Sequence, residues 1–174
     1  NSGVKIEYSG YSKQVEITIE GGYDPSSTGT DLTKRDISKY TTAFVRNTGS
    51  GASATSNSLL VLGNQTNIIF DGCTFNGQYG LNDAGSVRAV FVAAGGGDAT
   101  LQLNNCVIKN FNRGSDGGTD GGAAVKVSKG RVLLNDVEMV NNKATARGGA
   151  ITTTAANSFL FMNCLLYTSD AADE

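Results

Sequence analysis

The chain has 174 residues, which is enough for one domain with a sizeable core, and its formal net charge is −2. Its few basic residues are scattered, which argues against a nucleic-acid partner, and no apolar run approaches the length of a membrane span. Glycine accounts for 23 residues and proline for one, which favours many short strands and tight turns; the absence of histidine excludes His-based general bases, Ser-His triads and most zinc sites.

After residue 57 the chain alternates between two kinds of predicted strand. Short apolar strands are expected at Ser58–Leu62, Arg88–Ala93, Ala123–Val127 and Ala150–Thr153. Each precedes a longer sequence segment, called a phrase below, such as NIIFDGCTFNG at residues 67–77. In these phrases apolar and polar residues alternate on both sides of a turn-forming pair. The last two short strands begin with similar tetrads, which we expect to align Gly121 with Gly148. No segment of this repeat has the periodicity of a crossover helix.

The alternating phrases align on their turn-forming pairs, with equivalent residues separated by 33, 31 and 27 positions. Residues two apart on a strand point the same way, so each column of equivalent apolar residues is predicted to face inward. These columns are Ile68, Leu101, Val132 and Phe159; Phe70, Leu103, Leu134 and Phe161; Cys73, Cys106, Val137 and Cys164; and Phe75, Ile108 and Met139. The turn-forming pairs are Asp71-Gly72, Asn104-Asn105, Asn135-Asp136 and Met162-Asn163.

A repeat of about 30 residues with three short strands and no helix cannot bury its apolar face alone. Stacking the repeats places like residues on like residues, which explains the cysteine column and predicts a ladder of Asn and Asp side chains. The prediction is therefore an all-β parallel solenoid whose column cysteines are buried and reduced. An antiparallel sandwich is the alternative, but its strands would have no reason to share column identities.

The same residues carry a resemblance to a known family. The GGA(I) tetrads followed by N-C-x-Φ or N-N-K-A phrases resemble polymorphic outer-membrane-protein-type repeats and the right-handed parallel β-helix of pectate-lyase-like surface proteins. The segment from Ile17 to Phe44 resembles the N-terminal region of large exported bacterial β-helix proteins, through Gly21-Gly22-Tyr23, Arg35-Asp36 and Thr42. The resemblance implies a right-handed parallel β-helix, with an N-terminal segment at residues 1–57 and about four coils at residues 58–163.

The last eleven residues, CLLYTSDAADE, resemble the conceptual translation of an adapter used in sequencing-library preparation. We therefore expect residues 164–174 to be a non-native tail on a truncated, metagenomic chain whose natural sequence ends near Asn163. The last coil would then lack a cap, and Ile151, Phe159 and Phe161 would be exposed. End-to-end association or poor solubility is the expected consequence.

Candidate catalytic and metal-binding groups are weak in this sequence. The acids are Asp71, Asp83, Asp98, Asp116, Asp120 and Asp136, of which Asp71 and Asp136 belong to turn-forming pairs. The cations Arg88, Lys109, Arg113, Lys126, Lys129, Arg131, Lys143 and Arg147 form no lyase motif and are predicted to form a solvated face. Asp116 and Asp120 could hold calcium only weakly, and Asp24 and Asp31 are weaker candidates. We predict no catalytic, cofactor-binding or metal site.

The resemblance implies a non-enzymatic, adhesin-like or structural segment of a secreted or cell-surface bacterial protein. Its long faces would present loops such as Gly77–Val87 and Asn112–Gly122 to a glycan or to a protein of a host or another surface. The alternative is a fragment of a polysaccharide lyase or glycoside hydrolase whose catalytic coils are missing, since this fold serves adhesins, enzymes and passive stalks alike.

Overall fold

The structure, a computed structural model, describes residues 4–6, 15–26, 33–46, 58–63, 66–78, 88–93, 99–113, 122–144, 148–154 and 158–168. Within these residues the chain is all-β, without helices. The strands are β1 (Val4–Ile6), β2 (Val15–Glu20), β3 (Thr42–Val45), β4 (Ser58–Leu62), β5 (Thr66–Asp71), β6 (Cys73–Asn76), β7 (Arg88–Ala93), β8 (Thr100–Asn104), β9 (Val107–Lys109), β10 (Asn112–Arg113), β11 (Val125–Val140), β12 (Lys143–Ala144), β13 (Ile151–Thr153) and β14 (Ser158–Thr168).

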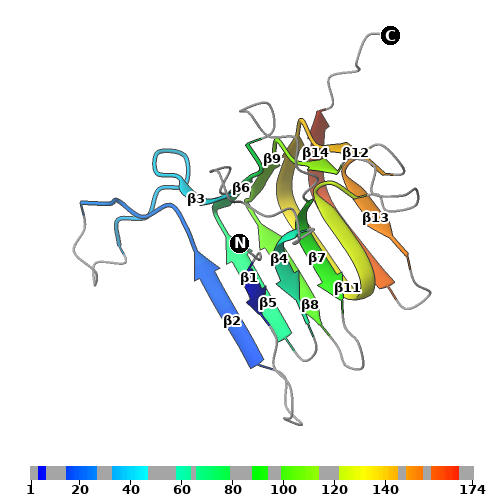
Figure 1. The fold of residues 1–174 in the computed structure, drawn as a ribbon. Helices are drawn as coiled ribbons and strands as arrows, with labels where there is room; N and C mark the ends of the chain where they lie inside the picture. Colours follow the sequence, from blue (N-terminus) through cyan, green and yellow to red (C-terminus); the bar gives the residue numbers. More distant parts are fainter. Residues whose placement is uncertain are drawn as a thin grey trace, which may run out of the picture.

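Parallel pairing joins twelve of these strands into one curled sheet (Figure 1). Its first wall holds β1, β4, β7, the start of β11 and β13, and its second wall holds β2, β5, β8, the middle of β11 and β14. A further row, β3–β6–β9, continues the second wall onto the end of β11. Each strand lies on its counterpart in the next repeat, as the all-β parallel prediction requires.

Strand β11 links the two walls without a loop. We expected a strand, a loop and a second strand here, but β11 runs unbroken and pairs with β7 on one wall and β8 on the other. Its register on β7 shifts between Val127 and Lys129, and Gly130 follows with a φ of 115°. That backbone conformation is open to glycine and strained for other residues, so Gly130 allows the strand to bend where a loop was expected.

The inward columns of the inner repeats are confirmed. Ile68 pairs in register with Leu101 and Leu101 with Val132, while the neighbouring column joins Phe70, Leu103 and Leu134. The third joins Phe75, Ile108 and Met139. All of these side chains are buried in one core.

The columns assigned to the last repeat are wrong by one residue. Leu160, not Phe159, lies opposite Val132; Met162, not Phe161, lies opposite Leu134; and Leu165, not Cys164, lies opposite Val137. The glycine tetrads show the same slip, since the two glycines with a left-handed backbone are Gly122 and Gly148, and Val125, not Ala124, lies opposite Ile151. The four consecutive residues from Phe159 to Met162 are all apolar, so apolar and polar residues do not alternate there and the sequence does not indicate which of them face inward. Only the pairing of β14 with β11 sets the register.

The turn-forming pairs of the inner repeats adopt the expected left-handed backbone. Gly72, Asn105 and Asp136 have φ values of 66°, 50° and 51°. The predicted side-chain ladder is present as well: Asn135 Nδ2 donates to Asn104 Oδ1 at 2.8 Å, and Asn105 Nδ2 donates to Asp71 Oδ1 at 2.8 Å. Turn residues therefore also tie each repeat to the next.

Cys73 and Cys106 are buried in the core and form no disulfide, as predicted. Cys106 Sγ donates to the oxygens of Asn104 and Phe70, at 3.1 and 3.5 Å. Burial raises the pKa of Cys73 and raises the pKa of Cys106 from 9.0 to about 12. Both thiols therefore remain protonated at neutral pH. The side chain of Cys164 lies outside the described residues.

Strand β14 extends through Thr168, so residues 165–168 of the tail expected to be non-native pair in parallel with the end of β11. The remaining tail residues, 169–174, lie outside the described part of the chain.

Candidate functional site

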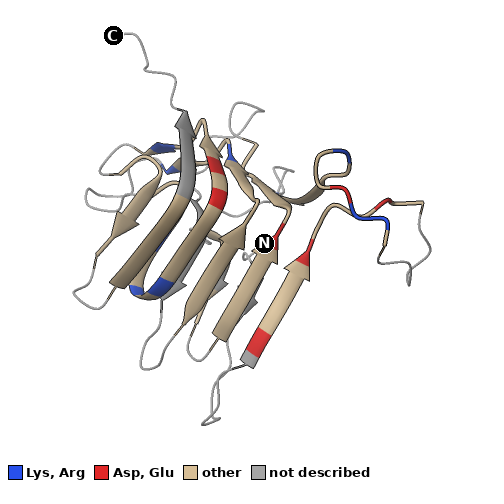
Figure 2. Ribbon diagram, turned by 180° about the vertical axis from the view of Figure 1, so that it is seen from behind, with Lys and Arg blue, Asp and Glu red and all other residues tan. Residues whose placement is uncertain are grey.

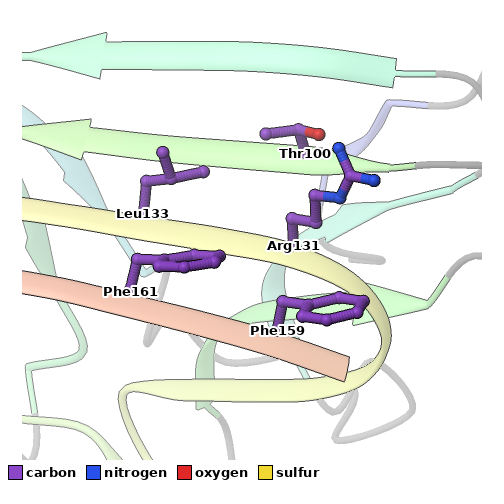
Figure 3. A pocket seen from close by; sticks show the side chains of 5 residues that line it. All are labelled: Thr100, Arg131, Leu133, Phe159 and Phe161. Atoms are coloured by element: carbon purple, nitrogen blue, oxygen red, sulfur yellow. The ribbon is translucent and has the colours of Figure 1, made fainter. Parts of the chain in front are cut away.

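An open groove of about 440 Å³ lies on the outer face of the second wall, over β8, β11 and β14. Its lining residues are Thr100, Arg131, Leu133, Phe159 and Phe161 (Figure 3). Arg131 pairs in register with Thr100 on one side and Phe159 on the other, and Leu133 pairs with Phe161. The five side chains share one face because residues two apart on a strand point the same way.

The groove combines aromatic surface with one cation. Phe159 and Phe161 are each at least half exposed, and their positions on β14 are ~6.6 Å apart along the strand. The Arg131 guanidinium carbon lies 5.9 Å from the centroid of the Phe159 ring, a cation–π contact. Arg131 is exposed, and no ion pair of the described residues involves it. The wall also carries acidic residues, on β2 and on the later part of β11 (Figure 2). The groove can therefore stack an apolar or sugar ring and donate hydrogen bonds beside it.

Sequence reasoning missed this groove. It assigned Phe159 and Phe161 to inward-facing columns and expected their exposure only because the last coil lacks a cap, and it treated Arg131 as one of several solvated cations. Both rings are exposed, but they are exposed on the outer face. Only the register of β14 on β11 turns the two rings outward. Spacing gave no warning, because Val132 and its observed partner Leu160 are 28 positions apart, only one more than the 27 expected.

The two candidate acids in the described turns do not form a catalytic pair. Asp71 lies 3.0 Å from Arg35 Nη2 and accepts from Asn105. Asp136 is exposed at a left-handed turn position, in the column next to that of Asp71 and two repeats away. Both therefore have the turn-forming role expected of them.

Several predicted residues lie wholly outside the described part of the chain. They are Asp31, Asp83, Asp98, Asp116, Asp120 and Arg147. The weak calcium site at Asp116 and Asp120 stays a prediction, as does ligand presentation by most of the loops Gly77–Val87 and Asn112–Gly122. Among the residues that the structure does describe, no three acidic or thiol side chains are grouped to hold a metal ion.

The prediction of a solvated basic face needs one correction. Arg131 and Lys143 are exposed, and Lys109, Lys126 and Lys129 are partly exposed. Arg113, in the two-residue strand β10, is instead fully buried. The side chain of Arg88 is not described. Arg113 therefore lies inside the protein and does not belong to a solvated face.

The N-terminal segment is fastened to the next repeat through Arg35. Arg35 Nε donates to the Gly21 oxygen at 2.9 Å, and Nη2 lies 3.0 Å from Asp71 Oδ2, an ion-pair distance without hydrogen-bond alignment. The Asp36 amide donates to the Gly22 oxygen at 2.7 Å. Residues singled out by the family resemblance therefore meet in one cluster.

The rest of that segment is ordered by local hydrogen bonds. Thr42 Oγ1, at the start of β3, accepts from the Gly22 amide at 3.1 Å. Asp24 accepts from the Ser26 side chain and backbone and from the Tyr40 hydroxyl, and these bonds lower the pKa of Asp24 to about 2. Asp24 is thus a turn anchor.

Replacing Arg35 with alanine should lower the free energy of unfolding by about 1–3 kcal/mol, because it removes a charge-assisted hydrogen bond and a partly buried ion pair. Urea unfolding followed by circular dichroism measures the loss. Lys143→Ala, at an exposed cation, should change stability by less than ~0.5 kcal/mol. Equal effects of the two substitutions would show that the Arg35 contacts contribute nothing.

Comparison with known proteins gives no match to a family model, a curated protein or a solved structure. No helix in the described residues is long and apolar enough to cross a membrane. Functional inference therefore depends on the geometry of the fold and the groove.

Proposed function

We propose that the chain is a right-handed parallel β-helix, in which an N-terminal segment, residues 1–57, is followed by about four coils. Support comes from three rows of strands that pair in parallel across the repeats and from left-handed turns at the same position of each inner repeat. The cross-repeat side-chain ladder supports the same architecture. A stack of this kind supplies a rigid, elongated wall on which a binding surface can be displayed.

We further propose that it acts as a non-enzymatic, adhesin-like segment of a bacterial protein at the cell surface or outside the cell, and that it binds a glycan through the groove. The groove is the observation that carries this proposal. The C–H face of a sugar ring can pack on Phe159 or Phe161, while Arg131 and Thr100 can hydrogen-bond to its hydroxyls or carboxylate. A protein partner that inserts an apolar side chain is the competing ligand class.

Binding to a glycan array, followed by titration with the best glycan, tests the proposal. Phe161→Ala should weaken binding about tenfold or more, because it removes one of the two rings. Ile69→Ala is the matched control: Ile69 belongs to the same outward column as Phe161 but lies three strands away, on β5. The titration is done at protein concentrations where the chain is monomeric.

An array without binding, or equal losses in the two variants, would contradict glycan recognition by the groove. The enzyme alternative makes a different prediction, because it requires release of unsaturated or reducing ends from polygalacturonate or alginate. We expect none, with or without calcium. Were such release reproducible with pure protein, Asp116 and Asp120 would be the first residues to replace.

A further inference from the structure

The large apolar residues exposed among the described residues lie at the two ends of the stack. They are Ile17 (38% exposed), Ile37 (43%), Val45 (44%), Phe159 (50%), Phe161 (58%) and Met162 (55%). The first three belong to β2, β3 and the segment between them, and the last three belong to β14. Figure 1 shows β2 and β14 at opposite ends of the second wall. Exposure of this kind, concentrated on two opposed surfaces, marks interaction sites.

Ile17 and Met162 belong to columns that are otherwise buried. Register pairing continues the column of Ile17 through Ile68, Leu101 and Val132 to Leu160. The three middle members are completely buried. The end residues therefore have the side-chain chemistry and orientation of core residues and lack only a neighbouring repeat.

The neighbouring column has the same arrangement. It begins at Ile19 in β2 and ends at Met162 in β14, with buried Phe70, Leu103 and Leu134 between them. A second repeat placed against either end would thus meet apolar partners at both positions.

The polar columns match across such a junction. Inside the stack, asparagine amides donate to acids of the preceding repeat: Asn67 Nδ2 donates to Glu16 at 2.7 Å, and Asn105 Nδ2 to Asp71 at 2.8 Å. Glu20 and Asn163 are the two ends of one column. If the β14 end of one copy met the β2 end of another, Asn163 would lie beside Glu20 and an asparagine would again be next to an acid, now between two chains.

The first wall offers the same continuity. Strand β1 is at one end and β13 at the other, and the column that starts at Val4 ends at Ile151. Parallel strands in both walls are therefore available at each end, in one common register.

We propose that this surface binds a second copy of the chain, head to tail. Strand β2 of one copy pairs in parallel with β14 of the next, with Ile17 beside Leu160 and Ile19 beside Met162. The contact reproduces the packing that each repeat already makes with its neighbour. Because the two surfaces differ, the association is heterologous and extends to short filaments. This proposal does not rest on glycan binding, although β14 borders both the groove and the proposed junction.

Charge argues against pairing between two β2 ends. Two antiparallel β2 strands would bring Glu16 and Glu20 of one copy close to Glu20 and Glu16 of the other, and like charges across a strand pair are destabilising. The head-to-tail arrangement places no two acids of these columns together.

Sedimentation velocity of the wild-type chain at increasing protein concentration is the first test. We expect monomers to convert progressively to dimers and longer species. A wild-type chain that stays monomeric at every accessible concentration would overturn the proposal without any substitution.

Two charged variants then test the geometry. Ile17→Lys blocks the β2 end, and Met162→Lys blocks the β14 end; both positions are exposed enough for an ammonium group to reach water. Each variant alone should be monomeric, because each lacks one of two different surfaces. Their equimolar mixture should form dimers and stop there, since the intact β14 end of Ile17→Lys meets the intact β2 end of Met162→Lys.

Thr74→Lys is the matched control, because Thr74 lies on β6, inside the stack, and faces outward. It should assemble like the wild type. Met162→Lys added to wild type should also shorten the assemblies by capping them, which requires no folded Ile17→Lys chain. Dimerisation of Ile17→Lys alone would indicate symmetric β14 contacts instead, and mixtures without dimers would refute head-to-tail pairing.

Discussion

Replacing Cys106 with aspartate should lower the free energy of unfolding by about 3–5 kcal/mol, enough to unfold many domains of this size. Cys106 is buried in the column between Cys73 and Val137. A carboxylate there would lose its hydration and face the oxygens of Asn104 and Phe70, which now accept from the thiol. The urea midpoint followed by circular dichroism measures the loss.

Cys106→Val is the matched control. It keeps the approximate volume of the side chain and gives up only weak S–H hydrogen bonds, so it should cost less than ~1.5 kcal/mol. Similar urea midpoints for the aspartate and valine variants would show that position 106 is not in the core. Rapid alkylation of Cys73 or Cys106 in the native state would lead to the same conclusion.

The Cys106 thiol also gives stability a defined pH dependence. Its pKa is about 12 in the native state, against 9.0 when unperturbed, so the unfolded chain loses this proton first as pH rises. Between these two values the native state binds more protons, and stability falls with rising pH by at most ~1.4 kcal/mol per unit from this group. Cys106→Val should show a correspondingly shallower alkaline loss, while the two proteins should have parallel profiles below pH 9.

The inner repeats were predictable because several local signals agree in them. Apolar and polar residues alternate on both sides of turn residues that favour a left-handed backbone, as at Asp71-Gly72 and Asn104-Asn105. Equivalent columns in successive phrases then indicate parallel stacking. The short strands Ser58–Leu62 and Arg88–Ala93 have the predicted bounds for the same reason.

The last repeat and the groove were not predictable from these signals. Four successive apolar residues from Phe159 fit either register, and a one-residue slip exchanges the core face for the solvent face. Burial of Arg113 depends on packing between segments far apart in the sequence, and the alternation of apolar and polar residues along one strand cannot predict it. The resemblance identified Arg35 as part of a motif, but its ion pair with Asp71 joins residues 36 positions apart, a contact that only the folded chain reveals.

Asn142 is a second position where one substitution should have a large effect, because its side chain joins two repeats inside the protein. It is 5% exposed; its Oδ1 accepts from the Phe111 amide at 3.2 Å, and its Nδ2 donates to the Ile108 oxygen at 2.8 Å. Asn142→Leu removes both hydrogen bonds from buried groups and should cost about 2–5 kcal/mol. Asn67→Leu, at a partly exposed position on the outer face, should cost less than ~1 kcal/mol.

Asn142→Asp separates hydrogen bonding from side-chain size. The aspartate keeps an acceptor for the Phe111 amide, but when ionised it points a buried charge at the Ile108 oxygen, which raises its pKa in the native state. The native state then binds the proton more tightly than the unfolded chain, so this variant should gain stability relative to wild type as pH falls from neutral through the ordinary aspartate range. Protonation restores a donor to Ile108. Urea midpoints at a series of pH values measure this recovery, and Asn142→Leu should not show it. Parallel pH profiles for the two variants, or a leucine variant as stable as Asn67→Leu, would mean that the Asn142 bonds do not hold the repeats together.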